Sequence, residues 1–309
     1  MKTFAPVLIP TLNRHEHLKR CVESLSRCTH AENTELIIGL DYPPSEKYEE
    51  GWKKICEYLP TITGFKKVTV LNREYNLGAV ENINSLIDYS NGIADRYILT
   101  EDDNEFAPCF LDFINKGLEV YKNDPKVLTV CGFNQYILSN KEIIFTYDNS
   151  AWGLGRWRDK YVPNNNDTQK AVSKLKTVLK IYHYYPALLN SVINALKRGR
   201  TNGDTNMSCY CIAHDCYQLR PAVTLVRNWG HDGSGEHCAI TDSFVKMVLP
   251  VEEYFSFQAS EPKRTREIDS MVRNNMMPKL VGRRIKYKIR VLLTAITYCI
   301  KSKKSQCNS

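Results

Sequence analysis

A regular alternation of strand-like and helix-like patterns over the first 135 residues limits the folds that this chain can adopt. Five short apolar runs have the length and composition of β-strands: residues 7–9, 36–40, 68–71, 97–100 and 127–133. Amphipathic segments separate these runs, and the first of them opens with a capping-box pattern at Asn13 and Glu16. Strands that alternate with helices form a mostly parallel sheet with helices on both faces. We therefore predict an α/β fold with a mostly parallel sheet.

The charge of the chain is concentrated at its carboxyl end. The formal net charge of the 309 residues is +8, but residues 279–309 contain nine Lys and Arg and no acidic residue. The preceding 278 residues are therefore close to neutral, which argues against a nucleic-acid partner. The hydrophobic fraction of 43% and the charged fraction of 25% exclude bulk disorder and a polytopic membrane protein.

Eleven cysteines are scattered along the chain, and their number is odd. No secretory signal is visible near the amino terminus, where Pro6 and Pro10 interrupt a short apolar stretch. We therefore expect free thiols and a cytoplasmic protein.

Three consecutive carboxylates, Glu101, Asp102 and Asp103, follow directly on the fourth predicted strand. In parallel sheets, ligands bind at the carboxyl ends of the strands. In an extended chain Glu101 and Asp103 project to one side and Asp102 to the other, so one carboxylate can bind a metal while another receives ribose hydroxyls. Carboxylates suit hard cations such as Mn²⁺ or Mg²⁺. The alternative is a solvated acidic turn that caps the helix after Pro108.

Other nucleotide-binding motifs are absent from the sequence. No Gly-x-Gly-x-x-Gly pattern follows the first strand, and no Gly-x-x-x-x-Gly-Lys-Ser/Thr pattern occurs, which argues against a dinucleotide dehydrogenase and a P-loop phosphotransferase. Asp41 ends the second predicted strand, where an acid can receive nucleotide hydroxyls or form a turn before Pro43.

Several segments, in this order along the chain, resemble nucleotide-sugar glycosyltransferases of the GT-A fold. The similarity is to bacterial polysaccharide-type, family-2-like enzymes and, more distantly, to N-acetylglucosaminyltransferase I. The segments are 9–14, Asp41, 76–78 with Asn82, 100–104 with Ala107 and Pro108, 152–157, and 228–237. Leu154 stands where the family pattern has a central Trp. The resemblance spans roughly residues 5 to 240 and implies the GT-A fold.

The resemblance also implies a role for each matching position in the donor half, residues 1–135. It implies that the nucleoside is bordered by Pro10, Asn13, Arg14 and Asp41. It implies that the diphosphate is lined by Asn76 and Asn82, and that ribose and sugar face Glu101 and Asp102. Asp103 would hold the metal, Mn²⁺ or Mg²⁺. The resemblance thus identifies the acidic triplet with the DXD motif of such enzymes.

The acceptor half, residues 136–262, would supply the catalytic base and the acceptor contacts. An inverting displacement needs a carboxylate base near the acceptor hydroxyl, and Asp204 is the nearest match to the family pattern, with Asp232 and Glu236 as further candidates. Trp152, Gly153 and Trp157 match the family's Trp-rich segment. The two Trp side chains either stack on sugar rings or belong to the core.

The tail, residues 263–309, contains a basic amphipathic segment. In a helix, one side of this segment would carry Val291, Leu292, Ala295, Ile296 and Cys299. That apolar side beside many bases is suited to an anionic membrane surface, and a solvated end is the alternative. The sequence does not determine the oligomeric state.

Together with the acidic triplet, the resemblance implies a metal-dependent, inverting glycosyltransferase of the GT-A (Rossmann-like) fold. Its donor would be a nucleoside-diphosphate sugar, UDP-linked, and its acceptor a glycan or lipid-linked saccharide in surface polysaccharide synthesis at the cytoplasmic face of a membrane. A nucleotidyltransferase or phosphohydrolase is the first alternative, because it also binds phosphates through acids and a metal. A non-catalytic, membrane-associated binding module is the second.

Overall fold

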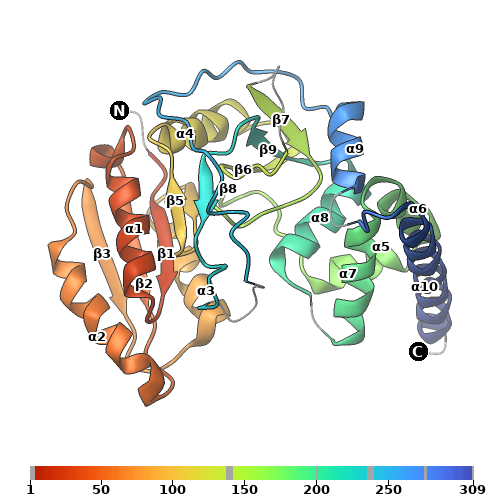
Figure 1. Ribbon diagram of the computed structural model, residues 1–309, viewed down its shortest axis with the longest axis horizontal. Helices are drawn as coiled ribbons and strands as arrows, with labels where there is room; N and C mark the ends of the chain where they lie inside the picture. Colours follow the sequence, from red (N-terminus) through yellow and green to blue (C-terminus); the bar gives the residue numbers. More distant parts are fainter. Residues whose placement is uncertain (1–3, 137–141, 200, 235–239, 275–276, 308–309) are drawn as a thin grey trace.

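A computed structural model of the chain has an α/β architecture built around one large sheet (Figure 1). It describes residues 4–136, 142–199, 201–234, 240–274 and 277–307. The sheet has eight strands, which in spatial order are β3 (Lys67–Asn72), β2 (Glu35–Leu40), β1 (Val7–Thr11), β4 (Arg96–Leu99), β8 (Leu154–Trp157), β6 (Val127–Cys131), β9 (Tyr217–Pro221) and β7 (Ile143–Thr146).

The five strands that the sequence predicts all form, as β1 to β4 and β6. β3, β2, β1 and β4 run parallel, and β6 is parallel to β9. β8 lies antiparallel between β4 and β6, and β7 closes the edge antiparallel to β9. The second half of the chain thus completes the same sheet as the first half.

Helices cover both faces of the sheet, as predicted. α1 (His15–Ser26), α2 (Glu49–Tyr58) and α4 (Phe110–Val120) share a core with Val7 and Ile9 of β1. Leu8, between them, packs on the other face with Leu86 of α3 (Gly78–Asn91). Alternate side chains of a strand point to opposite faces, so the helices lie on two sides. Three short 3₁₀ helices complete this half: η1 (Ala31–Asn33), η2 (Glu46–Tyr48) and η3 (Leu59–Thr61).

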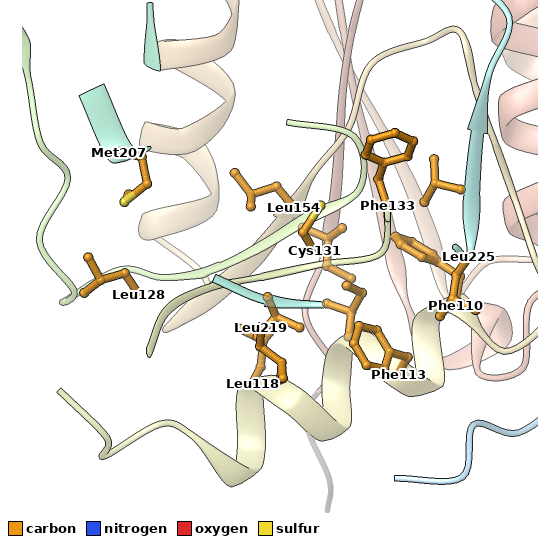
Figure 2. Packing of buried hydrophobic residues seen from close by; sticks show 14 of the residues in the cluster. Phe110, Phe113, Leu118, Leu128, Cys131, Phe133, Leu154, Met207, Leu219 and Leu225 are labelled. Carbon is orange, nitrogen blue, oxygen red and sulfur yellow. The ribbon is translucent and has the colours of Figure 1, made fainter. Parts of the chain in front are cut away.

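The centre of the core lies where α4 packs on β6, β8 and β9. Figure 2 shows side chains of α4, among them Phe110 and Phe113, against Cys131, Leu154 and Leu219 of the sheet. Each apolar side chain of this size stabilises the fold by roughly 1.5–3 kcal/mol when fully buried. This packing fixes β8, and with it the segment that precedes β8, against the end of β4.

The predicted capping box at Asn13 is wrong. α1 begins at His15, Arg14 occupies the N-cap position, and no side chain caps the helix. Glu16 contacts the neighbouring His15 instead of reaching back to the cap. The guanidinium of Arg14 points towards the acidic triplet and bonds to Asp103. The start of α1 is therefore held at the end of β4.

A second, two-stranded sheet joins two distant parts of the chain. β5 (Asn104–Phe106) follows the acidic triplet directly and pairs antiparallel with β10 (Val226–Asn228). In this pairing Asn104 lies opposite Asn228. The residues after Asn228 are therefore held beside Asp103.

The remaining helices form a layer beside the sheet, seen at the right of Figure 1. They are α5 (Asn165–Val172), α6 (Leu175–Tyr184), α7 (Pro186–Lys197), α8 (Gly203–His214), α9 (Arg266–Asn274) and α10 (Val281–Cys307). Pro186 opens α7 at the first helical position, where its missing N–H costs no helical hydrogen bond. Among the described residues, no helix combines the length and the hydropathy that a crossing of the bilayer requires.

The predicted membrane-facing side of the tail is wrong. Val291, Ala295 and Cys299 are buried, because α10 packs with this side on α5, α6 and α7. The thiol of Cys299 also donates to the carbonyl oxygen of Ser173, at 2.9 Å. Apolar side chains that the sequence pattern places on an outer face are thus used to attach the helix to the rest of the protein.

The half-buried ammonium of Lys160 ties the chain just after β8 to the segment between α4 and β6. Lys160 donates to the carbonyl oxygens of Tyr121, Asp124 and Val127 at 2.7, 3.0 and 2.6 Å. It also lies 3.5 Å from the centre of the Trp157 ring, and burial lowers its pKa to about 8.

We expect Lys160→Met to destabilise the protein by about 1–3 kcal/mol, because three partly buried carbonyl groups lose their donor. Urea unfolding followed by circular dichroism measures the change. Lys122→Met is the matched control, since Lys122 forms an exposed ion pair with Asp95. Equal midpoints for the two variants would show that the three carbonyl contacts contribute nothing to stability.

Candidate active site

The acidic triplet lies where β4 ends and β5 begins. The side chains of Asp102 and Asp103 are buried, whereas that of Glu101 remains open to solvent. The hydroxyl of Thr11, at the end of β1, donates to Oδ2 of Asp102 at 2.8 Å. The carboxyl ends of neighbouring parallel strands therefore meet here, as expected for a ligand site in this class of fold.

Arg14 bridges the two buried carboxylates. Its guanidinium forms one ion pair with Oδ1 of Asp102 and another with Oδ2 of Asp103, the latter at 2.8 Å. Burial lowers the pKa of Arg14, but the charges of Asp102 and Asp103 outweigh burial and raise that pKa overall. Burial also raises the pKa of Asp102, against the opposing effect of Arg14. The guanidinium thus offsets the repulsion between the acids.

The segment that follows β10 forms one side of the site around Asp103. The amide of Asn228 donates to Oδ1 of Asp103 at 2.6 Å, and the backbone N–H of Trp229 donates to the Asp103 carbonyl oxygen at 2.9 Å. A Cβ atom at Gly230 would lie 2.0 Å from Oδ2 of Asp103. Only glycine therefore leaves this carboxylate in place.

The donor atoms at Asp103 suit a hard divalent cation. Each oxygen of Asp103 has one hydrogen-bond donor, and a carboxylate oxygen offers two lone pairs, so each keeps one for a metal. Within the described ranges, no three His, Cys, Asp or Glu side chains converge as a complete metal site. This is compatible with Mg²⁺ or Mn²⁺, which bind through one or two carboxylates and complete their shell with water and substrate phosphates.

Glu101 lies within electrostatic range of a second acid, Asp204. The protein packed around Glu101, followed by the charges of Asp103 and Asp204, raises the pKa of this carboxyl, although part of the side chain is still accessible to solvent. The indole N–H of Trp152 donates to Oε2 of Glu101 at 3.0 Å. The structure therefore brings together residues that lie about a hundred positions apart in the chain.

Asp204 is oriented by a chain of polar side chains. Asn149 donates to Oδ1 of Asp204, Gln218 donates to Oδ1 of Asn149, and Arg220 donates to Oε1 of Gln218, each at 2.7 Å. Arg220 is almost fully buried and also pairs with Asp148. Asp204 itself stands in the first turn of α8, where the helix dipole favours its charge, while burial raises its pKa.

The three acceptor-side candidates have different positions. Trp152 is half-buried at the site, with its ring edge-on to Phe133 and Phe244. Gly153 has φ of 69°, and a Cβ atom there would lie 2.7 Å from the Phe110 ring.

Trp157 is 2% exposed and donates to the Leu118 carbonyl oxygen. Trp157 is thus a core residue without a free ring face, and we no longer include it among the acceptor contacts.

The predicted nucleotide-side residues Asp41, Asn76 and Asn82 hold the loop after β3. The carboxylate of Asp41 accepts the backbone N–H groups of Leu77 and Gly78 at 2.8 and 2.9 Å, and the amide of Asn76 at 3.3 Å. Asn82 is buried and donates to the Gly39 carbonyl oxygen. These contacts within the protein explain why Asp and Asn occur at the three positions, and no ligand is needed to explain them.

The remaining candidates lie at the end of β1 or near the start of α1. Pro10 belongs to β1, and the Asn13 carbonyl oxygen lies where a Cβ atom of Gly51 would be, so this loop packs on α2. Asp232 pairs with His17 of α1 at 3.1 Å. Hydrogen bonds from Ser234 and His17 overcome the opposing effect of burial and lower the pKa of Asp232 to about 2. Glu236 lies outside the described residues.

Sequence reasoning missed several residues that contact the acids. Thr11, Asn228 and Gly230 lie within segments 9–14 and 228–237, which resemble the family. The resemblance could therefore have pointed to these three residues. Asn149 lies outside every recognised segment, and only the fold shows its contact with Asp204.

The fold and this site define an α/β protein with a cluster of acidic side chains at the carboxyl ends of its strands. Residues 7–177, more than half of the chain, match the family model described as glycosyl transferase family 2. The chain therefore belongs to glycosyl transferase family 2, and the predicted GT-A fold class is confirmed. No curated protein sequence matches the chain at a significant level.

Solved structures with some likeness share little sequence with the chain. A mannosyltransferase from Pyrobaculum calidifontis in complex with GDP-Man and Mn²⁺ has a TM-score of 0.39 and 12% identity, and the match covers 71% of this chain and 56% of that one. For TarS of S. aureus the TM-score is 0.37 and the identity 12%, over 71% of this chain and 37% of that one. The chain thus spans little more than half of the first structure's length, and likeness at this level carries no argument about function.

Proposed function

We propose that the protein is a metal-dependent, inverting glycosyltransferase that uses a nucleoside-diphosphate sugar. The observation that carries this proposal is that one segment, residues 149–152, contacts both Asp204 of α8, through Asn149, and Glu101 at the end of β4, through Trp152. Membership of glycosyl transferase family 2 supports the reaction class. The site combines a place for a hard cation with a separate carboxylate for proton transfer.

Asp103 would hold the metal, Mn²⁺ or Mg²⁺. When bound, such an ion stabilises the negative charge that gathers on the departing nucleoside diphosphate. Asn228 and the backbone at Gly230 keep the Asp103 carboxylate in one orientation. Arg14 offsets the charge of Asp102 and supplies a second cation beside the site.

Asp204 would act as the base. The acceptor hydroxyl oxygen bonds to the anomeric carbon as the bond from this carbon to the diphosphate oxygen breaks, and the hydroxyl proton passes to the Asp204 carboxylate. The sugar passes through an oxocarbenium-like state, as in glycoside hydrolysis. Burial raises the pKa of Asp204, which brings it nearer to the range in which a base is effective.

We propose a UDP-linked hexose or N-acetylhexosamine as donor and a glycan or lipid-linked saccharide as acceptor. Residues 1–135 would bind the donor, through Pro10, Asn13 and Arg14 among others, and residues 136–262 the acceptor, near Trp152. The half-buried side chain of Trp152, which reaches Glu101, supports this placement. Such an acceptor fits surface polysaccharide assembly at the cytoplasmic face of a membrane.

A panel of nucleotide sugars with Mn²⁺ tests the proposal. We expect one donor to raise the melting temperature and to release its nucleoside diphosphate in the presence of a saccharide acceptor. Release of pyrophosphate instead would favour a nucleotidyltransferase, and hydrolysis of a phosphate ester a phosphohydrolase. A protein that responds to no donor would favour a non-catalytic binding module.

A further inference from the structure

The outer surface of α10 carries an apolar stripe that no described part of the protein covers. Ile285, Ile289 and Leu293 are 54%, 54% and 60% exposed. Residues four apart in a helix advance by only about 40° around its axis, so these three side chains form one stripe. Three isolated apolar residues on a surface need no explanation, but an aligned row of them does.

A basic stripe runs beside the apolar stripe. Arg283, Lys286 and Arg290 are exposed, and their spacing of three and four residues places them on one side of α10. Helical geometry puts the apolar stripe between these bases and the buried side that contains Val291. The three stripes give α10 an inner face attached to the protein and an outer face that is both apolar and cationic.

The position of α10 leaves this outer face accessible. The helix lies at the edge of the molecule opposite β3 and α2, with α5, α6 and α7 on its inner side (Figure 1). The candidate active site lies at the ends of β1 and β4, on other elements. The surface can therefore engage a partner without blocking the site.

We infer that this outer face of α10 binds an anionic lipid surface. Exposed apolar side chains enter the boundary between headgroups and acyl chains, while flanking bases contact anionic headgroups. A second copy of the chain fits less well, because residues 279–309 contain nine bases and no acid, so two such faces would repel each other. This inference rests on the proposed function only in expecting a lipid-linked acceptor.

Co-sedimentation of the full-length protein with vesicles tests this surface. We expect binding to vesicles of equal parts phosphatidylglycerol and phosphatidylcholine, weaker binding at high salt, and little binding to phosphatidylcholine alone. Ile289→Ser with Leu293→Ser should lower the partition coefficient at least about tenfold, because two apolar anchors are lost. Replacing Arg283, Lys286 and Arg290 by Gln should lower it by about a hundredfold at low salt.

Val248→Ser with Val251→Ser is the matched control, since both valines are more than four-fifths exposed and lie outside α10. This pair should bind vesicles as the wild type does. Unchanged binding in both α10 variants would overturn the inference, as would equal binding to neutral and anionic vesicles. Loss of binding in the Gln variant alone would overturn it too, because a purely electrostatic surface does not need the apolar stripe.

Two further measurements distinguish lipid binding from self-association and from catalysis. In sedimentation velocity, a dimer that the Ser pair dissociates would show that the stripe joins two copies, which overturns the lipid assignment. Nucleoside-diphosphate release without vesicles should be the same in the Ser pair and in the wild type. Vesicle binding without a response to any donor would support the lipid-binding surface and refute the proposed function. A response to a donor without vesicle binding would support the proposed function and refute the lipid-binding surface.

Discussion

Replacing Asp103 by Asn should reduce nucleoside-diphosphate release by about a thousandfold or more, which corresponds to about 4 kcal/mol of transition-state stabilisation. The substitution keeps the shape of the side chain and one oxygen for Asn228, but it removes the charge that would hold the cation. Turnover with the responsive donor measures the loss. The shift in melting temperature that Mn²⁺ causes in the wild type should also disappear. Undiminished turnover in this variant would refute the metal assignment.

A change at the neighbouring Gly230 gives an independent check on the same site. The Cβ atom of Ala at Gly230 would lie 2.0 Å from Oδ2 of Asp103, so the carboxylate must move. We expect Gly230→Ala to weaken the Mn²⁺ response while Asp103 keeps its charge. Gly282→Ala is the control, because a Cβ atom there has open space around it. If both glycine variants behave alike, the Gly230 segment does not shape the metal site.

Replacing Asp204 by Asn should lower kcat by about a hundredfold to ten-thousandfold, the usual contribution of a general base. The KM for the donor should change little, because Asn still accepts the hydrogen bond from Asn149 and the donor side remains intact. Steady-state kinetics with donor and acceptor varied separately distinguishes the two constants.

Asp232→Asn is the matched control for the base. Asp232 is half-exposed and pairs with His17, and hydrogen bonds lower its pKa to about 2, which makes it a weak base. We expect its kcat to stay within about threefold of the wild type, within the usual range of surface changes. A severe loss in Asp232→Asn together with normal turnover in Asp204→Asn would transfer the role of base to Asp232.

Much of the donor half could be predicted because its signals are local. Each of the five predicted strands is a short, nearly continuous apolar run, which is typical of parallel sheets. Four of them are largely buried, whereas β3, at the edge of the sheet, stays partly exposed. The acidic triplet follows one of these strands directly, so the fold class alone places it at the ligand-binding edge. The capping box failed because Asn13 and Glu16 fit a local pattern, whereas the tertiary contacts of Arg14 decide how α1 begins.

The second half was harder to predict because its elements depend on distant partners. β8 is a four-residue strand, and only its place between β4 and β6 defines it. The same insertion buries Trp157, which the sequence pattern placed at the acceptor site. A tryptophan looks alike in sequence whether it stacks on a sugar or fills a core, since burial is set by the neighbours.

The sequence by itself determined that this chain forms an α/β sheet with three acids at a strand end and a cationic carboxyl terminus. These properties depend on residue type and spacing along the chain. Only the tertiary structure decided that Asn228 and Gly230 meet Asp103 through the pairing of β5 with β10. It alone also decided that residues 149–152 link Asp204 to Glu101. It also decided which side of α10 is buried and which remains outside. Contacts between residues a hundred positions apart follow from strand pairing and helix packing, which local patterns do not specify.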